Sequence, residues 1–185
     1  PSPAPVSSPV MPGLAEAVNE FDERVEKWLA PRRSDSLDHL MYGISSAADH
    51  ALLWMALGAA RTARTRDLRW GRRFLGALAG ESVVTNLVKI VFRRVRPQEH
   101  FENTERLPYG MRRPITSSFP SGHAVTAFTA ASVLARGSRL APAYYVLAAT
   151  IASSRVYTRI HHASDGVAGV ALGLALGRVA RRLVR

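Results

Sequence analysis

The 185 residues are enough for one domain with a sizeable core but hardly for two. The sequence has no cysteine, which excludes disulfides, thiolate chemistry and cysteine-ligated metals. Its 25 basic and 14 acidic residues give a formal charge of +11, which favours anionic partners: nucleic acid, anionic lipid or phosphorylated substrates.

The N-terminal segment predicts a tail followed by an amphipathic helix. Residues 1–12 lack the basic region and the long apolar run of a secretory signal, so we expect a disordered tail. Between Gly13 and Ala30, apolar residues recur at steps of three and four with charges on the opposite side. Such a helix either lies on a membrane surface or covers a bundle. Its charged face carries more acids than bases, which is unlike a typical binder of anionic lipid.

Five further helical segments follow Pro31 and the polar run after it. They cover about 40–60, 73–93, 122–136, 140–158 and 163–181. No strand-like alternation and no internal repeat is evident, so the predicted fold class is all-α. We assign 13–38 to the amphipathic helix with its linker and 39–185 to one helical domain.

The composition of these segments leaves a membrane bundle and a soluble bundle as alternatives. A bilayer span needs roughly 20 mostly apolar residues, and no segment reaches that length without an ionisable group. The segments are nevertheless rich in Ala, Gly and Ser, and the last carries glycines at every fourth position: Gly169, Gly173 and Gly177. Polar faces are nearly absent from 124–135, 140–152 and 166–177.

The ionisable residues inside the segments also favour a membrane, because such residues are functional candidates there. They are Asp49, His50 and Glu81, which either pair within the bundle or touch a substrate. We therefore predict an integral membrane helical bundle of about five transmembrane helices plus the N-terminal amphipathic helix.

The first of three polar clusters ends the 73–93 segment. Lys89 and Arg96 are seven residues apart, so a helix continuing through them would place both cations on one face. Pro97 would then stop that helix. By itself, a basic helix end of this kind also suits an anchor at the membrane interface.

The second cluster is Pro120-Ser121-Gly122-His123, directly before an apolar run. A tight turn ahead of a helix directs backbone N–H groups at one spot and binds phosphate well. Ser121 adds a hydroxyl donor, and His123 would lie at the rim of the anion site. Alone, the cluster equally suits an ordinary cap with an incidental histidine.

The third cluster contains Arg155, His161 and Asp165. His161 and Asp165 are four residues apart, so the carboxylate can hold the imidazole N–H if this stretch is helical. Arg155 supplies a planar, bidentate donor for phosphate oxygens. The neighbouring His162 would point elsewhere and receives no role.

Counting the crossings of the chain places all three clusters on one side of the bundle. The arginine-rich stretches 61–73 and 178–185 fall on the opposite side. Together, the clusters combine cations, an anion-binding turn, a nucleophile with its acid and a second histidine. That combination favours phosphate chemistry over three unrelated interface anchors.

The order and spacing of these motifs resemble the three-part signature of the type 2 phosphatidic acid phosphatase (PAP2) superfamily. This superfamily also includes glucose-6-phosphatase, soluble bacterial acid phosphatases and vanadium haloperoxidases. Its small membrane members usually have six membrane helices, whereas we expect five here, with the amphipathic helix in place of the first.

The resemblance implies a phosphatase that needs no metal and no cofactor. His161 would attack phosphorus, and Asp165 would keep it in the nucleophilic tautomer. His123 would protonate the leaving oxygen and then activate water. The phosphoryl oxygens would be held by Lys89, Arg96, Ser121, Gly122 and Arg155. Fixed cations can replace a metal because phosphoryl transfer depends mostly on positioning and charge stabilisation.

A site at the bilayer interface predicts a lipid phosphate as substrate. Candidates are phosphatidic acid, phosphatidylglycerol phosphate, a polyprenyl phosphate or diphosphate, and a polyprenyl-phosphoryl sugar phosphate. In the 98–117 loop, Tyr109, Arg112 and Arg113 are candidate headgroup contacts. Partners are thus the lipid phosphate and membrane lipids, without nucleic acid; the oligomeric state is left open. We expect a bacterial plasma membrane, and the positive-inside rule favours a site on its extracytoplasmic side.

Two other classes of function remain as alternatives. One is a vanadate-dependent haloperoxidase, which shares the anion site; the short chain and lipid-facing helices speak against it. The other is a non-enzymatic basic protein that binds nucleic acid or anionic membranes, with salt-sensitive binding. Against the latter, the arginines lie at segment ends and no aromatic platform accompanies them.

Overall fold

The chain is all-helical in its computed structural model, which describes residues 12–48, 51–97 and 116–184. None of these residues forms a strand, which confirms the predicted class. The elements are α1 (Pro12–Leu29), a 3-10 turn (Ala30–Arg32), α2 (Asp35–Ala47), α3 (Leu52–Thr65), α4 (Leu68–Val91), α5 (Gly122–Ala135), α6 (Ala141–Tyr157) and α7 (Ala163–Leu183).

Two predicted boundaries are wrong. The segment expected at 40–60 is two helices, α2 and α3, and Ala51 at the break has a φ of 57°, which a right-handed helix cannot continue. The arginine-rich stretch 61–73 is not a connector, because only Arg66 and Asp67 lie between α3 and α4. Arginine is a good helix former, so charge alone does not end a helix. Asp49 and His50 lie outside the described residues.

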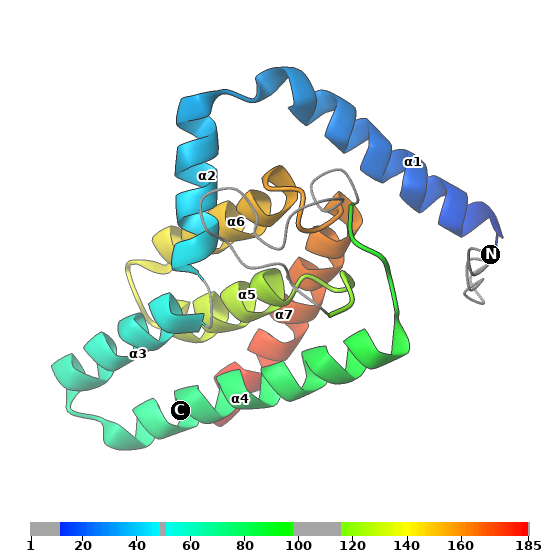
Figure 1. The fold of residues 1–185 in the computed structure, drawn as a ribbon. Coiled ribbons are helices and arrows are strands. Elements are labelled where there is room, and N and C mark those ends of the chain that lie inside the picture. Colours follow the sequence, from blue (N-terminus) through cyan, green and yellow to red (C-terminus); the bar gives the residue numbers. More distant parts are fainter. Residues whose placement is uncertain (1–11, 49–50, 98–115, 185) are drawn as a thin grey trace.

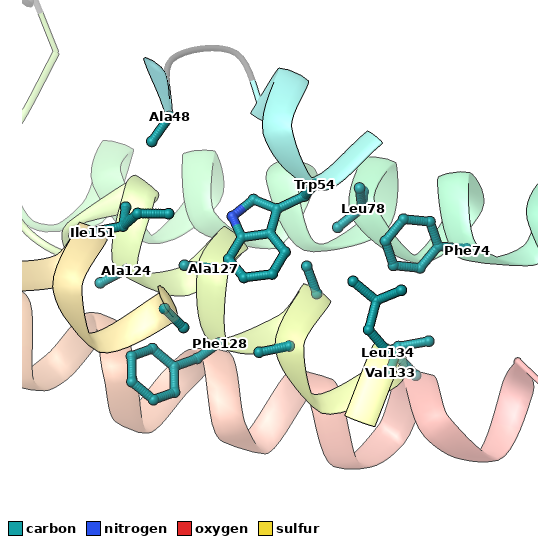
Figure 2. Packing of buried hydrophobic residues seen from close by; sticks show 14 of the residues in the cluster. Ala48, Trp54, Phe74, Leu78, Ala124, Ala127, Phe128, Val133, Leu134 and Ile151 are labelled. Carbon is teal, nitrogen blue, oxygen red and sulfur yellow. The ribbon is translucent and has the colours of Figure 1, made fainter. Parts of the chain in front are cut away.

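Helix α5 lies in the middle of the bundle, between α4, α6 and α7 (Figure 1). Its residues are buried on every side, as expected for a helix that is apolar all round. Figure 2 shows the aromatic side chains that pack around it: Trp54 of α3, Phe74 of α4 and its own Phe128. A central helix with both ends defined is the frame on which the polar clusters are placed.

The glycines of α7 let this helix approach α5 closely. A Cβ added at Gly169 would lie 2.7 Å from the carbonyl oxygen of Ser121, and one at Gly173 would lie 2.6 Å from that of Val125. At Gly177, an added Cβ would again lie closer than a normal contact to an α5 side chain. The predicted close packing of small residues is therefore confirmed.

The outer surface of the bundle is apolar where a soluble bundle would be polar. Large hydrophobic side chains are exposed along α4 and α7: Leu75, Val83, Leu87, Ile90, Val91, Val167, Leu174, Val179 and Leu183. Among the described helices, α4 and α7 are long and apolar enough to cross a membrane. The count of five transmembrane helices stays a prediction.

Helix α1 lies at the periphery of the fold (Figure 1). Its apolar side chains Leu14 and Trp28 are each 57% exposed, while Asp22 is only 9% exposed. Glu20 and Glu23 are exposed as well, so Asp22 differs from the other acids of α1 in being buried. The predicted amphipathic helix is confirmed. The predicted tail lies outside the described residues, apart from Pro12, which begins α1.

Candidate active site

The three polar clusters meet at the N-terminal end of α5. Nη1 of Arg96, from the first cluster, lies 3.3 Å from Nε2 of His161, from the third. Cε of Lys89 would lie 3.8 Å from a Cβ added at Gly122, in the second cluster. Side chains from three distant segments therefore surround one space, as the count of crossings predicted.

The arginine-rich stretches lie at the other end of α5, which confirms the second half of that prediction. Arg61 donates to the carbonyl of Leu134 at 3.2 Å, and Arg136 donates to the carbonyl of Arg181. A helix of 14 residues is about 21 Å long, so the two groups of cations are well separated.

The first cluster does not lie on one helix, contrary to the prediction. Helix α4 ends at Val91, and residues 92–97 run on without helical structure. The backbone of Arg94 instead pairs with the segment before α5: its N–H donates to Ser117 Oγ and its carbonyl accepts from Ser118 N, each at 3.0 Å. Pro97 also disfavours a helical conformation at the residue before it.

Backbone carbonyls hold the two cations in place. Arg96 donates to the carbonyls of Ile160 at 2.7 Å, Thr116 at 3.1 Å and Ser117 at 3.3 Å. Lys89 Nζ donates to the Ser117 carbonyl at 2.8 Å. Burial lowers the pKa of Arg96 to about 10, so the guanidinium is still charged at neutral pH. Both heads are thereby fixed beside the start of α5.

His161 is oriented by a backbone carbonyl. Its Nδ1 lies 2.8 Å from the carbonyl oxygen of Ser118, which can only accept, so the ring proton is on Nδ1. Nε2 therefore carries the lone pair, and it faces Arg96. His161 lies between α6 and α7 and is 3% exposed. Burial, with a contribution from nearby Arg96 and Arg155, lowers its pKa to about 3 and keeps the imidazole neutral.

Asp165 does not hold the imidazole N–H directly, because the stretch is not helical at His161. Helix α7 begins at Ala163, and the carboxylate Oδ2 lies 3.7 Å from His161 Nδ1, too far for a hydrogen bond. Oδ2 instead accepts from the backbone N–H of His162 at 2.9 Å. At 3.7 Å, the fully buried carboxylate still acts on the ring through its charge.

The second cluster differs from an ordinary helix cap. Ser121 precedes α5, yet its side chain makes no capping bond. Its buried Oγ has no hydrogen-bond partner among the residues that the structure describes, so it is available to a ligand. Gly122 begins α5, and the half-buried His123 follows in the same turn. The first-turn N–H groups of a helix lack intrahelical acceptors and carry partial positive charge.

Arg155 is held by a residue that sequence analysis missed. Its Nη1 donates to the Oγ of Ser45 on α2 at 2.5 Å, and both residues are buried.

Glu81 accepts hydrogen bonds from Thr85, at 3.2 Å, and from Thr126, in line with pairing inside the bundle.

Two further residues missed by sequence analysis are Asp22 and Arg94. Arg94 donates to Asp165 at 2.8 Å and to Asp22 at 2.7 Å. Arg94 lies two residues before Arg96 in the motif. In an extended segment, residues two apart lie on the same side, so this spacing was a usable signal. Asp22 carries no signal, because it is one of several acids on α1.

Three predicted headgroup contacts lie outside the described residues: Tyr109, Arg112 and Arg113. Within the ranges that the structure covers, no three histidine or acidic side chains gather closely enough to hold a metal ion.

Two hollows lie between α1 and the helices α6 and α7, and His161 lines one of them. A cavity of about 350 Å³ lies between α1 and the α6–α7 connection, and His161 and His162 are part of its wall. An apolar groove of about 560 Å³ runs between α1, α6 and α7. Val25, Val156 and Ala163 line both, so the cavity and the apolar groove adjoin.

Comparison with known proteins finds one family and two crystal structures of the same fold. The family model of the PAP2 superfamily matches residues 70–185. The decaprenylphosphoryl-5-phosphoribose phosphatase of Mycobacterium tuberculosis is 33% identical over 140 residues, which are 74% of this chain and 75% of that protein. The lipid A 1-phosphatase of Porphyromonas gingivalis is 32% identical over 123 residues, 62% of this chain and 24% of the relative.

Two crystal structures share the fold. The transmembrane PAP2 type phosphatidylglycerolphosphate phosphatase of Bacillus subtilis superposes with a TM-score of 0.73 at 24% identity, covering 90% of this chain and 85% of that one. Aquifex aeolicus LpxE has a TM-score of 0.69 at 23% identity, with 86% and 93% covered.

Proposed function

The chain belongs to the PAP2 superfamily, and from this premise we propose that it is a membrane phosphatase that hydrolyses a lipid-linked phosphate through a phosphohistidine at His161. The observation that carries the proposal is the state of this imidazole. Its Nδ1 proton is bound by the Ser118 carbonyl, so Nε2 carries the lone pair, which accepts a hydrogen bond of 3.3 Å from the fixed guanidinium of Arg96.

In the proposed first step, His161 Nε2 attacks phosphorus, a P–N bond forms, and the P–O bond to the lipid breaks. The charge on the transferring phosphoryl group is stabilised by Lys89, Arg96 and Arg155, together with the Ser121 hydroxyl and the N-terminus of α5. His123 donates a proton to the leaving oxygen, so the lipid departs as an alcohol. The positive imidazole of the intermediate is stabilised by the charge of Asp165 and by the Ser118 carbonyl.

In the second step, His123, now neutral, takes a proton from water, and the resulting oxygen nucleophile attacks phosphorus. The P–N bond breaks, inorganic phosphate leaves, and the electron pair returns to His161 Nε2. Each histidine thereby regains its starting protonation state, so the cycle is closed without a metal.

The proposed substrate is a polyprenyl chain that carries a sugar phosphate. Three observations support it. The relative from Mycobacterium tuberculosis is named for such a compound. The cavity beside His161 has polar side chains in its wall, among them Asn19 and Glu23 of α1, which suit hydroxyl groups. The apolar groove that adjoins it suits a hydrocarbon chain.

We further propose that the site faces the outside of the cytoplasmic membrane. The arginine-rich ends of α3 and α7 lie at the far end of α5 from the site. Positively charged segments beside membrane helices stay preferentially in the cytoplasm. The site at the other end of the bundle then opens on the opposite side.

The test is phosphate release by the full chain in detergent, in EDTA, from a panel of lipid phosphates that includes a polyprenyl-phosphoryl ribose phosphate. We expect turnover, inhibition by vanadate and incorporation of an acid-labile phosphate into the protein. His161→Ala is expected to abolish both turnover and labelling. The matched control is His39→Ala, which removes an exposed histidine on α2 and should leave both intact.

Turnover that persists in His161→Ala would refute this nucleophile. Activity confined to other lipid phosphates on the panel would refute the sugar-phosphate substrate and leave the reaction in place.

A further inference from the structure

Helix α1 brings a buried carboxylate to the active site. Asp22 is 9% exposed, although it belongs to a helix whose large apolar side chains point outward. It also lies outside residues 70–185, which the family model matches. A carboxylate is expensive to bury unless it is paired and hydrogen-bonded, so its partners explain its position.

Asp22 binds the start of α7 with both oxygens. Its Oδ1 accepts from the backbone N–H of Ser164 at 2.8 Å, and its Oδ2 accepts from the Ser164 hydroxyl at 2.7 Å. A negative charge is favourable at this place, because the N-terminus of a helix carries partial positive charge. The carboxylate thus acts as a cap for α7 that comes from a helix 142 residues away in the chain.

Arg94 joins Asp22 to Asp165. Its Nη2 donates to Asp22 Oδ2 at 2.7 Å, while Nη1 donates to Asp165 Oδ1 at 2.8 Å and to Ser164 Oγ at 2.6 Å. Burial opposes the charge on Arg94, but the carboxylates outweigh it and raise the pKa of the guanidinium. The planar guanidinium therefore bridges two carboxylates, and Asp165 is held at 3.7 Å from His161 Nδ1.

The charges of this group matter for the reaction. Two carboxylates share one guanidinium, so Asp22, Arg94 and Asp165 together carry a net charge of about −1 beside His161. In the resting state the imidazole is neutral, so this negative charge has no positive charge on the ring to stabilise. It becomes favourable when the ring turns positive on forming the phosphohistidine, which selectively stabilises the transition state. Without the carboxylate of Asp22, the charge of Arg94 would cancel that of Asp165, and no net negative charge would remain beside His161.

We propose that Asp22 is a positioning residue of this phosphatase: through Arg94 and Ser164, it fixes Asp165 and leaves it a net negative charge against His161. The inference rests on the proposed function. A second contact keeps α1 in place when Asp22 is changed, since Glu26, one turn further along α1, pairs with Arg159 after α6. An Asp22 variant therefore tests the carboxylate and not the attachment of the helix.

The test compares Asp22→Asn with Glu20→Gln in the full chain, each removing one carboxylate from α1. Glu20 is exposed and lines neither hollow, so its variant should match the wild type. Asp22→Asn is expected to lower kcat about ten- to a hundredfold, the range for a lost hydrogen bond to a charged group, with KM unchanged. Inhibition by vanadate, which mimics the transferring phosphoryl group, should weaken by a similar factor.

Vanadate separates positioning from folding. If Asp22→Asn only reduced the folded fraction, Vmax would fall while the inhibition constant for vanadate stayed the same, and this result would overturn the proposal. Unchanged kcat and unchanged vanadate inhibition would overturn it as well.

Two further variants guard against poor folding of Asp22→Asn. Asp22→Glu keeps the carboxylate and should recover part of the lost kcat. Ser164→Ala removes one hydroxyl from the group without stranding a charge, so it should lower kcat in the same direction but less. A wild-type level of kcat in Ser164→Ala, alongside a misfolded Asp22→Asn, would count against the proposal. If the wild type releases no phosphate from any lipid, the proposed function fails, and the positioning role falls with it.

Discussion

Replacing Gly169 by alanine is expected to damage activity and stability together, because α7 touches α5 next to the active site at this position. The added Cβ would lie 2.7 Å from the Ser121 carbonyl oxygen and 2.8 Å from Ala124 Cβ. Both atoms belong to the start of α5, so neither can turn aside like the end of a flexible side chain. The two helices must move apart by several tenths of an ångström.

The magnitude follows from two opposing effects. Overpacking of this kind costs about 1–3 kcal/mol. Alanine recovers about 1 kcal/mol, since it favours a helix over glycine. The net loss of stability is then about 2 kcal/mol at most, or roughly 4–8 °C in Tm for a chain of this size. Because Ser121 and the first turn of α5 form the proposed anion site, a shift there should lower kcat by up to about a hundredfold.

The assay measures kcat on a lipid phosphate and Tm in detergent for three variants. Gly177→Ala makes an equally close contact eight residues along α7, about 12 Å further from the site, so it should lower Tm and spare kcat. Gly80→Ala on α4 meets nothing within 4 Å and should lose neither. Equal loss of kcat in Gly169→Ala and Gly177→Ala would refute the reasoning, as would a Gly169→Ala variant with wild-type kcat and Tm.

Two further predictions concern charge. Arg96→Lys should lower kcat/KM at least tenfold, because an ammonium cannot contact the Ile160 and Thr116 carbonyls and the phosphate at once. The control is Arg93→Lys, which changes an exposed neighbour. Equal kcat/KM in the two variants would contradict this prediction. Stability should fall as the pH drops from about 6.5 towards 3. The pKa of His161 is about 3 in the folded chain, below the ordinary 6.5, so the unfolded chain binds the proton more readily. The loss is at most about 1.4 kcal/mol per pH unit. The loss of stability is measured as the difference in Tm between pH 7 and pH 5. An equal fall in Tm in His161→Gln would contradict the role of His161 in this pH dependence.

Local pattern in the sequence was enough for most of the helices. Amphipathic spacing identified α1, and apolar runs identified α5, α6 and α7 nearly to their ends, because the spacing of side chains on a helix depends on near neighbours alone. Counting the crossings then placed Lys89, His123 and His161 at one end of the bundle, which is a consequence of chain order in any antiparallel arrangement. Local pattern could not predict the break between α2 and α3. It also could not predict the end of α4 before Arg96, where backbone pairing with a distant segment decides the conformation.

The sequence by itself therefore determined the helical class, the motif residues and their common side of the bundle. The partners of those residues were decided only by the tertiary structure. The Nδ1 proton of His161 goes to the Ser118 carbonyl and not to Asp165, and every residue carries such a carbonyl, so composition gives no signal for it. Asp22 reaches Arg94 and Ser164 because packing brings α1 over the start of α7. Hydrogen bonds depend on distance and direction in space, and these are set by how whole helices pack rather than by spacing along the chain.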